Sequence, residues 1–399
     1  MNRFAAHLTT PEAAPPDEPW AAQSLATGAA GIALFHIERA HTRQGSWKQA
    51  HAWIRDAVTG EISAADTTGL FLGAPAIAFI LHAASAGSST RYRDALATMD
   101  AHVTKLAHRR AESAMARIDR GDCPVFREYD IFYGLVGIGA HLLRHDPGGS
   151  ALERILRYLT ALTEPLPGDG QALPGWWVAH DPHTRTSARY PRGHGNLGAA
   201  HGITGPLMLL SQAARRGITV NGQHEAIATI CDWLDTWQQD GETGAWWPEC
   251  VSFDDLRTGH PSQPGPARPS WCYGTPGIAR AQQLAAIATG DTTRQRMAEH
   301  ALAACLSDPA QLARLTDPGL CHGWAGVHQT VWHAAHDATT PTLAAFLPRL
   351  AEGLARHAQP TSQDVPGFLD GNAGTALALL TAARNVVPIS GWDACLLID

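Results

Sequence analysis

Three side chains in the second half of the chain have the chemistry to hold a metal ion. Cys272 lies in the run R-P-S-W-C-Y-G-T-P-G at 268–277, and Cys321 and His322 open the run C-H-G-W-A-G at 321–326. Thiols and imidazoles are preferred ligands of Zn²⁺, and a site with three protein ligands keeps a fourth position open for water or substrate. This donor set therefore predicts a catalytic zinc site, with one zinc per chain.

Each of the two cysteines stands just ahead of a glycine that opens an apolar helical pattern. A single cysteine in such a place is usually a small structural residue. Cys272 and Cys321, however, occupy equivalent points of two successive repeats, and successive repeats are neighbours in space. Their equivalence, together with the adjoining His322, favours a shared metal.

The glycine-rich helix start recurs along the whole chain. Its pattern is a glycine, two variable residues and a second glycine (alanine in one copy), and the seven copies lie at 28–31, 73–76, 134–137, 202–205, 274–277, 323–326 and 371–374. Amphipathic helical patterns separate the copies, for example at 92–110, 151–162, 224–238 and 293–306. Alternating strand patterns are not found, so each unit is interpreted as one apolar inner helix and one amphipathic outer helix.

These repeats predict an all-α fold, either a closed ring or an open solenoid. Glycine and alanine at the helix starts permit the close backbone approach that a ring requires where inner helices converge. We therefore favour a closed α/α toroid of seven inner and seven outer helices, with the open solenoid as the alternative. Two long connections, 165–198 and 239–270, are predicted to wall the mouth of a central site, since long loops in compact domains are usually functional.

Length and composition limit the other kinds of protein that this sequence could encode. At 399 residues the chain exceeds a simple single core, so it forms either two domains or a repeat architecture, and we predict one toroid domain over 1–399. The net charge of −7 and the lack of a basic stripe argue against nucleic acid as a partner. No signal peptide is visible in 1–20, and no run approaches the length of a membrane span. With seven cysteines, an odd number, a disulfide framework is not expected, and we predict a cytoplasmic protein.

Four motifs together resemble the lanthionine synthetase C-like family. They are Y-D-I-F-Y-G-L-V-G at 129–137, A-H-G-I-T-G-P at 200–206, W-C-Y-G-T-P-G at 271–277 and C-H-G-W-A-G at 321–326, and the resemblance covers nearly the whole chain in order. It implies a toroid whose central zinc is held by Cys272, Cys321 and His322. It also implies a cyclase that adds cysteine thiols of a dehydrated precursor peptide to dehydroalanine or dehydrobutyrine, forming thioether rings.

The resemblance also implies roles for residues at other helix starts. His201 matches the family histidine proposed as the acid that protonates the enolate or the base that takes the thiol proton. Asp130 matches the family aspartate and would orient His201 or Arg268, although an aspartate there is equally natural as a helix N-cap. Arg268 would stabilise the enolate, with a solvated loop arginine as its alternative. Tyr273 fits the pattern as a catalytic candidate, but adjacency to a ligand gives it no role by itself.

The chain departs from the family's cyclases in one respect, because no strand-rich, SH2-like insertion is evident. No kinase or lyase region is evident either, so a separate dehydratase must prepare the peptide. Two other functions remain open. A non-catalytic thiol- or peptide-binding member of the same fold is one, and a glycoside-processing toroid using Glu249 with Asp254 or Asp255 is the other.

Overall fold

A computed structural model describes residues 2–8, 18, 20–88, 90–166, 172–181, 185, 189–358 and 366–399. Parts of the long connection 165–198, at 167–171, 182–184 and 186–188, therefore lie outside the described residues, as does most of the segment 1–20 that lacks a signal-peptide pattern. The architecture below refers to the described ranges.

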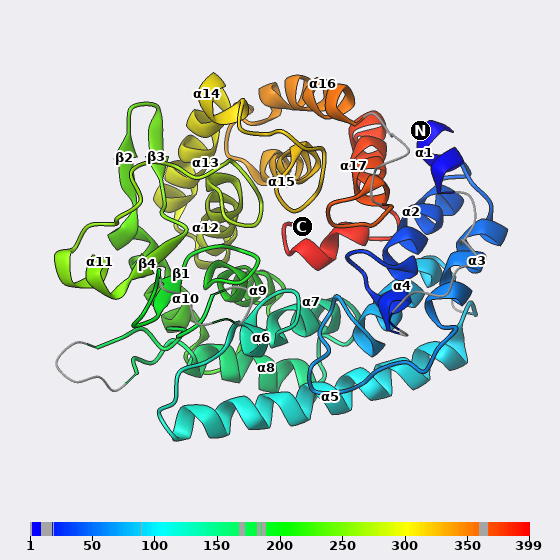
Figure 1. The fold of residues 1–399 in the computed structure, drawn as a ribbon, viewed down its shortest axis with the longest axis horizontal. Coiled ribbons are helices and arrows are strands. Elements are labelled where there is room, and N and C mark those ends of the chain that lie inside the picture. Colours follow the sequence, from blue (N-terminus) through cyan, green and yellow to red (C-terminus); the bar gives the residue numbers. More distant parts are fainter. Residues whose placement is uncertain are drawn as a thin grey trace.

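Seven helices of the described chain form an inner ring (Figure 1). They are α2 (Ala29–His41), α4 (Ala74–Ser85), α7 (Leu135–His145), α9 (Thr204–Arg215), α12 (Thr275–Thr289), α15 (Trp324–Asp337) and α17 (Asn372–Arg384). Each contacts the next in this order, and α17 contacts α2. Nearly all of their residues are buried, because one face of each inner helix packs on its ring neighbours and the other on an outer helix.

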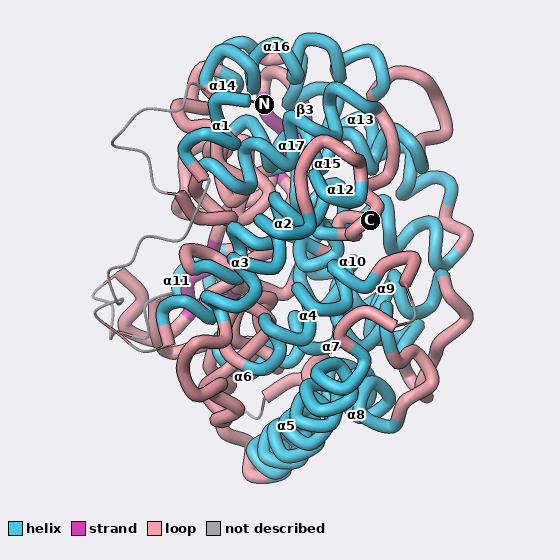
Figure 2. The backbone as a smooth tube through the Cα atoms, turned by 90° about the vertical axis from the view of Figure 1, so that its right-hand side faces the viewer, coloured by secondary structure: helices cyan, strands magenta, loops and turns pink. Residues whose placement is uncertain are grey.

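The outer layer follows the chain. It consists of α3 (Trp47–Ala57), α5 (Arg93–Asp119), α8 (Ser150–Ala161), α10 (Gln223–Trp237), α13 (Thr292–Ser307) and α16 (Leu347–His357), and the short α1 (Asn2–His7) lies against α17 in the seventh place. Figure 2 shows α5 lying across the outside of the ring near α4 and α7. The predicted all-α toroid is confirmed.

Backbone hydrogen bonds join the seven loop-to-helix junctions into a closed circuit. With N···O distances between 2.9 and 3.3 Å, N–H donates to C=O from Leu369 to Ala26, Cys321 to Leu369, Cys272 to Cys321, Ala200 to Cys272, Ile131 to Ala200, Phe71 to Phe132 and Leu25 to Phe71. Buried peptide groups need such partners, and here each junction finds them on its neighbour. The open-solenoid alternative is therefore wrong.

The second glycine of the repeated pattern lets each inner helix start directly on its own junction loop. A Cβ atom at Gly31, Gly137, Gly277, Gly326 or Gly374 would lie 1.8–2.1 Å from the carbonyl oxygen of the residue six positions earlier. The copy at 73–76 has alanine instead, and there Gly73 adopts a φ of +73°, so that α4 begins from a different backbone turn. The glycine pattern thus reflects the close approach of the backbone to itself.

The remaining elements of the described chain are short. Two antiparallel pairs of three-residue strands join β1 (His194–Asn196) to β4 (Cys250–Ser252) and β2 (Gln239–Gly241) to β3 (Gly244–Trp246). The short helices are α6 (Phe126–Tyr129), α11 (Phe253–Thr258) and α14 (Pro309–Leu312), with 3₁₀ turns η1 (Ala21–Gln23), η2 (Ala344–Phe346) and η3 (Trp392–Leu396). No helix of the described chain has both the length and the apolar character needed to cross a membrane.

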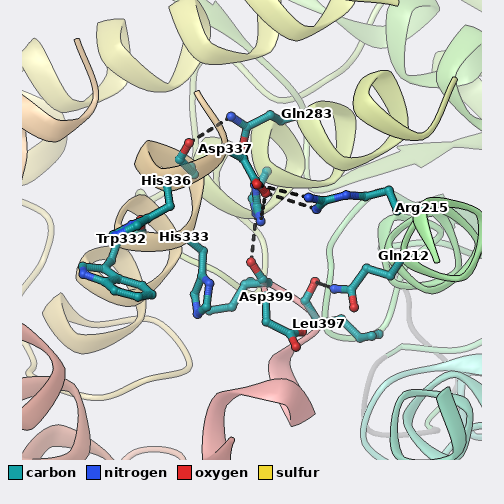
Figure 3. Close-up of polar contacts among 12 residues, drawn as sticks. Gln212, Arg215, Gln283, Trp332, His333, His336, Asp337, Leu397 and Asp399 are labelled. Carbon is teal, nitrogen blue, oxygen red and sulfur yellow. Dashed lines mark hydrogen bonds and ion pairs between the residues drawn. The ribbon is translucent and has the colours of Figure 1, made fainter. Parts of the chain in front are cut away.

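Residues 392–399 fill the centre of the ring, where η3 lies in Figure 1. Successive carbonyls of this segment accept hydrogen bonds from inner helices or junctions: Leu396 from Trp271, Leu397 from Gln212 and Ile398 from Arg280. In Figure 3 Gln212 lies beside Leu397, and Arg215 faces Asp337 at 3.1 Å. The lumen of the toroid is therefore packed with protein at this level.

Candidate active site

A cavity of about 460 Å³ opens where the inner helices begin. It is lined by Trp20, Ser24, Ala26, Phe71, Leu72, Phe132, Tyr133, His201, Cys321, His322, Leu369 and Asp370. Most of these residues are the one or two that precede the first glycine of a repeat. Because the seven junctions form a closed ring, residues at the same position of successive repeats together line a single cavity.

Two of the predicted metal ligands meet directly. Cys272 is buried and its thiol forms a hydrogen bond with that of Cys321, while the Cys272 N–H donates to the Cys321 carbonyl at 3.2 Å. Cys272 and Cys321 each lie two residues before the N-cap glycine of an inner helix, Gly274 of α12 and Gly323 of α15. The exposed N–H groups at such helix starts favour negative charge on a nearby sulfur.

The pKa values of the two thiols depend on each other. The hydrogen bond from Cys321 lowers the pKa of Cys272 to about 7, with burial acting in the opposite direction. The same hydrogen bond, followed by burial and the charge of Cys272, raises the pKa of Cys321. One thiolate is thus available near neutral pH, and a nearby cation is needed to deprotonate the second.

His322 is oriented by an aspartate. Its Nδ1 lies 3.0 Å from Asp317 Oδ2, and this hydrogen bond raises the pKa of His322. Burial raises the pKa of Asp317, but the hydrogen bond and charge of His322 outweigh it and the net shift is downward. Because Nδ1–H donates its hydrogen bond to the carboxylate, Nε2 is left for a metal. Arg268 Nη1 also lies 3.6 Å from Asp317 Oδ2, so Arg268 faces the same carboxylate.

Asp370 is a further ligand candidate that sequence reasoning missed. Cys321, His322 and Asp370 each offer a ligand atom within 4.8 Å of the others, and His322 Nε2 lies 3.6 Å from Asp370 Oδ1. Burial raises the pKa of Asp370. A signal was present, since Asp370 precedes Gly371 just as His322 precedes Gly323 and His201 precedes Gly202.

Asp130 binds both the backbone and His201. Its Oδ1 accepts from the N–H groups of Tyr133 and Gly134 at 2.7 and 2.8 Å, in the junction ahead of α7, and its Oδ2 lies 2.7 Å from His201 Nδ1. The N-cap of α7 is Gly134, so the N-cap interpretation of Asp130 is wrong; this buried carboxylate holds the junction loop and contacts His201 rather than Arg268. Because a carboxylate accepts hydrogen bonds, His201 donates from Nδ1, and its Nε2 is left for other partners.

Aromatic rings fix the position of His201. The rings of Phe132 and Phe126 lie 5.1 and 5.8 Å from it, centroid to centroid, and that of Tyr273 lies 6.4 Å away. The Tyr273 hydroxyl accepts from Asn196 Nδ2 at 3.2 Å, and burial raises the pKa of Tyr273 well above its usual value. Tyr273 is thus held as a neutral phenol between the thiol junction and His201.

Both aspartates of the glycosidase alternative are engaged in contacts of their own. Asp255 is buried in a capping box with Ser252 at the start of α11, and Asp254 forms exposed ion pairs with Arg192 and Arg257. The Trp pairs at 176–177 and 246–247 are buried and present no open rings for a ligand. Neither group presents paired carboxylates or open rings to the cavity.

The donor set fits zinc. Cys321, His322 and Asp370 offer their ligand atoms within 4.8 Å of one another, and Cys272 lies outside that group but beside Cys321. Thiols, an imidazole whose other nitrogen is bound by a carboxylate, and a neighbouring carboxylate are ligands and outer partners typical of zinc centres. His201 lines the same cavity as Cys321 and His322. The site thus brings zinc-type donors and an imidazole fixed by a carboxylate to one cavity.

The fold and site define an α/α toroid with thiol and imidazole donors at its helix starts. The chain belongs to the lanthionine synthetase C-like protein family, whose family model matches residues 19–397. The chain is similar to the nisin biosynthesis protein NisC of Lactococcus lactis subsp. lactis, with 24% identity over 205 residues, which make up 50% of this chain and 47% of that protein. The match thus spans about half the length of this curated relative. The solved structure of nisin cyclase has the same fold, with a TM-score of 0.81 and 20% identity over 100% of this chain and 95% of that chain.

Proposed function

We propose that this protein is a zinc-dependent lanthipeptide cyclase. The observation that carries the proposal is the donor set of Cys272, Cys321 and His322 at a cavity whose wall also holds His201, itself bound to Asp130 at 2.7 Å. Membership of the family and the similarity to a nisin biosynthesis protein support it. The substrate would be a dehydrated precursor peptide that carries cysteine and dehydroalanine or dehydrobutyrine, prepared by a separate dehydratase.

The reaction joins the peptide's sulfur to the β-carbon of the dehydro residue. The carbon–carbon π electrons move to the α-carbon and carbonyl as an enolate, and a proton then adds at the α-carbon, so the net change is transfer of the thiol hydrogen to carbon. Zinc held by Cys272, Cys321 and His322 would supply the positive charge that ionises the peptide thiol near neutral pH.

The chain's own residues manage the proton and the charge. His201, with Nδ1 fixed by Asp130, offers Nε2 to take the thiol proton or to return a proton to the enolate carbon. Arg268 lowers the pKa of Cys272 by its charge, and in this proposal the same charge stabilises the developing enolate. Tyr273 packs between these groups and limits the water around them. One domain over 1–399 without an SH2-like insertion remains the predicted organisation.

The test is ring formation itself. Protein loaded with zinc is incubated with a peptide containing cysteine and dehydroalanine, and the remaining thiols are counted by alkylation and mass spectrometry. Loss of thiols is expected with wild type and with Cys123→Ser, an exposed cysteine outside the donor set, and not with Cys321→Ala or after chelation. Full activity of metal-free protein would contradict the proposal.

The second candidate is a binding member of the same fold. It predicts that zinc and peptide bind while the thiol count stays constant in every variant. His201 bound to Asp130 at the cavity favours catalysis, because peptide capture alone needs no oriented imidazole. The thiol count separates the two.

A further inference from the structure

We propose that His82, Asp100 and His141 form a second metal site, for Zn²⁺ or a similar divalent cation, which clamps α4, α5 and α7 together. One atom of each residue lies within 4.8 Å of the others. The three side chains come from two inner helices and the long outer helix that lies across them. The function proposed above makes no use of them.

The distances suit a tetrahedral ion. Asp100 Oδ1 lies 2.9 Å from His82 Nε2 and 3.9 Å from His141 Nε2. Zinc bonds of 2.0–2.2 Å to nitrogen and oxygen place neighbouring ligand atoms about 3.3 Å apart, which is between these two values. Small side-chain rotations therefore bring both imidazoles and the carboxylate onto one ion.

The cluster also leaves polar groups unsatisfied. His141 is buried, its Nδ1 has no hydrogen-bond partner, and its contact with Asp100 is longer than a normal hydrogen bond. Asp100 forms no ion pair with a lysine or arginine in the described ranges, and its only ionic contacts are these two histidines. A divalent cation held by the two Nε2 atoms would give the carboxylate a positive partner, and it would give His141 Nε2 a bond in place of the hydrogen bond that it lacks.

Rings pack against the histidines of the cluster, and its Asp100 side is open to solvent. The ring of His145 stacks on that of His82 at 3.8 Å between centroids, and Phe79 lies 6.3 Å from His141. The Asp100 side chain is 43% exposed, whereas that of His141 is 1% exposed. An ion can therefore reach the cluster from the Asp100 side and keep one position for water.

The cluster is separate from the cavity. His82 is the ninth residue of α4 and His141 the seventh of α7, about 9–12 Å along each helix from its start. The cavity lies at the helix starts, and none of the three residues lines it. A metal here would join an outer helix to the inner ring, a structural role independent of catalysis.

The competing interpretation is a hydrogen-bonded polar cluster without metal. Metal stoichiometry distinguishes the two. Wild-type protein dialysed against micromolar Zn²⁺ is expected to hold a second equivalent beyond the one at the thiols. Asp100→Asn and His141→Ala are expected to lose that equivalent, and Asp94→Asn, an exposed aspartate on the same helix, is expected to keep it.

Cobalt separates the two sites by their spectra. Co²⁺ at Cys272 and Cys321 gives a thiolate-to-metal charge-transfer band, and Co²⁺ at the His82 cluster gives none, so failure of one site does not resemble failure of the other. We expect the band to saturate before binding is complete in wild type, and to persist in Asp100→Asn. The proposal is overturned if wild type binds no cobalt outside the charge-transfer band, or if Asp100→Asn binds as much as wild type.

Thermal unfolding gives an independent readout that does not require the thiol site. In Cys321→Ala, added Zn²⁺ should still raise Tm by several degrees, because an ion that binds only the folded protein stabilises it. Adding Asp100→Asn to that variant should abolish the shift. An unchanged shift in the double variant would also overturn the proposal.

Discussion

His201 and His322 are oriented in the same way, although they lie on different junctions. Each donates Nδ1 to one oxygen of an aspartate, Asp130 or Asp317, whose other oxygen accepts from backbone N–H groups of the same junction. The backbone thus holds the carboxylate, and the carboxylate holds the ring. Both histidines consequently keep Nε2 free of the aspartate, for the proton-carrying role proposed for His201 and the ligand role proposed for His322.

Asp130→Asn tests the first of these arrangements. The amide can donate to His201 Nδ1 and so favours the wrong tautomer, which in comparable carboxylate–histidine pairs costs about 10²–10⁴-fold in turnover. Cyclisation rate and metal content are measured together, and zinc content is expected to remain at the wild-type level. Unchanged turnover would show that Asp130 serves only to hold its junction loop.

Asp317→Asn tests the second arrangement. Loss of an outer carboxylate typically weakens metal binding about 10–100-fold, so zinc affinity should fall by that factor in a competition titration with a chromophoric chelator. Asp254→Asn, an exposed aspartate, is the matched control. Equal affinities in the two variants would remove Asp317 from the site.

Zinc binding should weaken in acid. Binding displaces a proton from Cys321, whose pKa is raised by the hydrogen bond with Cys272, at any moderate pH. It also displaces one from Cys272 below about pH 7 and one from His322 below that group's raised pKa. The plot of log affinity against pH should therefore have a slope of about one at high pH and steepen toward about three in acid. A flat profile would exclude these three ligands.

The sequence revealed the donors that carry distinctive chemistry and missed those that do not. Cys272, Cys321, His322 and His201 stand out because thiols and imidazoles are rare at repeated glycine junctions. Asp317 and Asp370 do not, since aspartates near proline and glycine are common in turns and caps. The signal for Asp370 is its place directly before Gly371, which matches that of His322 before Gly323 in the preceding repeat.

At the scale of elements, helix positions followed from periodicity. The outer helices α8, α10 and α13 begin and end within one residue of the predicted spans, and α5 runs nine residues beyond 92–110. The strand pairs were missed because each strand has three residues, too few for a visible alternation, and β1 and β4 are far apart in sequence. The seventh outer position was also hard to foresee, since α1 has only six residues.

Gly137→Ala tests the reason for the repeated glycine. Its Cβ would lie 2.0 Å from the Ile131 carbonyl oxygen and 2.8 Å from the Leu70 Cβ, so α7 must shift. We expect the free energy of unfolding to fall by about 2–3 kcal/mol, measured by denaturant titration. Gly148→Ala, nearby and with no atom within 4 Å of the added Cβ, is the control and should change stability little. Equal effects in the two variants would contradict the packing argument.

At the scale of the whole molecule, two features hold the toroid together. One is the ring of hydrogen bonds between junctions, and the other is the segment 392–399, which fills its centre. Asp393 accepts from Gln329 at 2.6 Å and lies 2.7 Å from His333, while Arg280 bonds Ile398 and Asp337. The repeats predicted a ring or a solenoid, but this central segment has no repeat signal and could not be placed from the sequence.

Arg280→Ala tests the central segment. The arginine is 1% exposed, and its removal leaves the Ile398 carbonyl without this donor and Asp337 with Arg215 as its remaining ion-pair partner in the described chain. A loss of about 3 kcal/mol in the free energy of unfolding is expected. Arg157→Ala, which breaks an exposed pair with Glu153, should cost under about 1 kcal/mol. A small effect of Arg280→Ala would show that the segment adds little to the ring.

The identity of the atoms around the first equivalent of zinc tests the central claim most directly. X-ray absorption at the zinc edge should show two sulfur atoms at about 2.3 Å and a shell of nitrogen or oxygen at about 2.0–2.1 Å, with one sulfur lost in Cys321→Ala. A first coordination shell without sulfur would contradict the account.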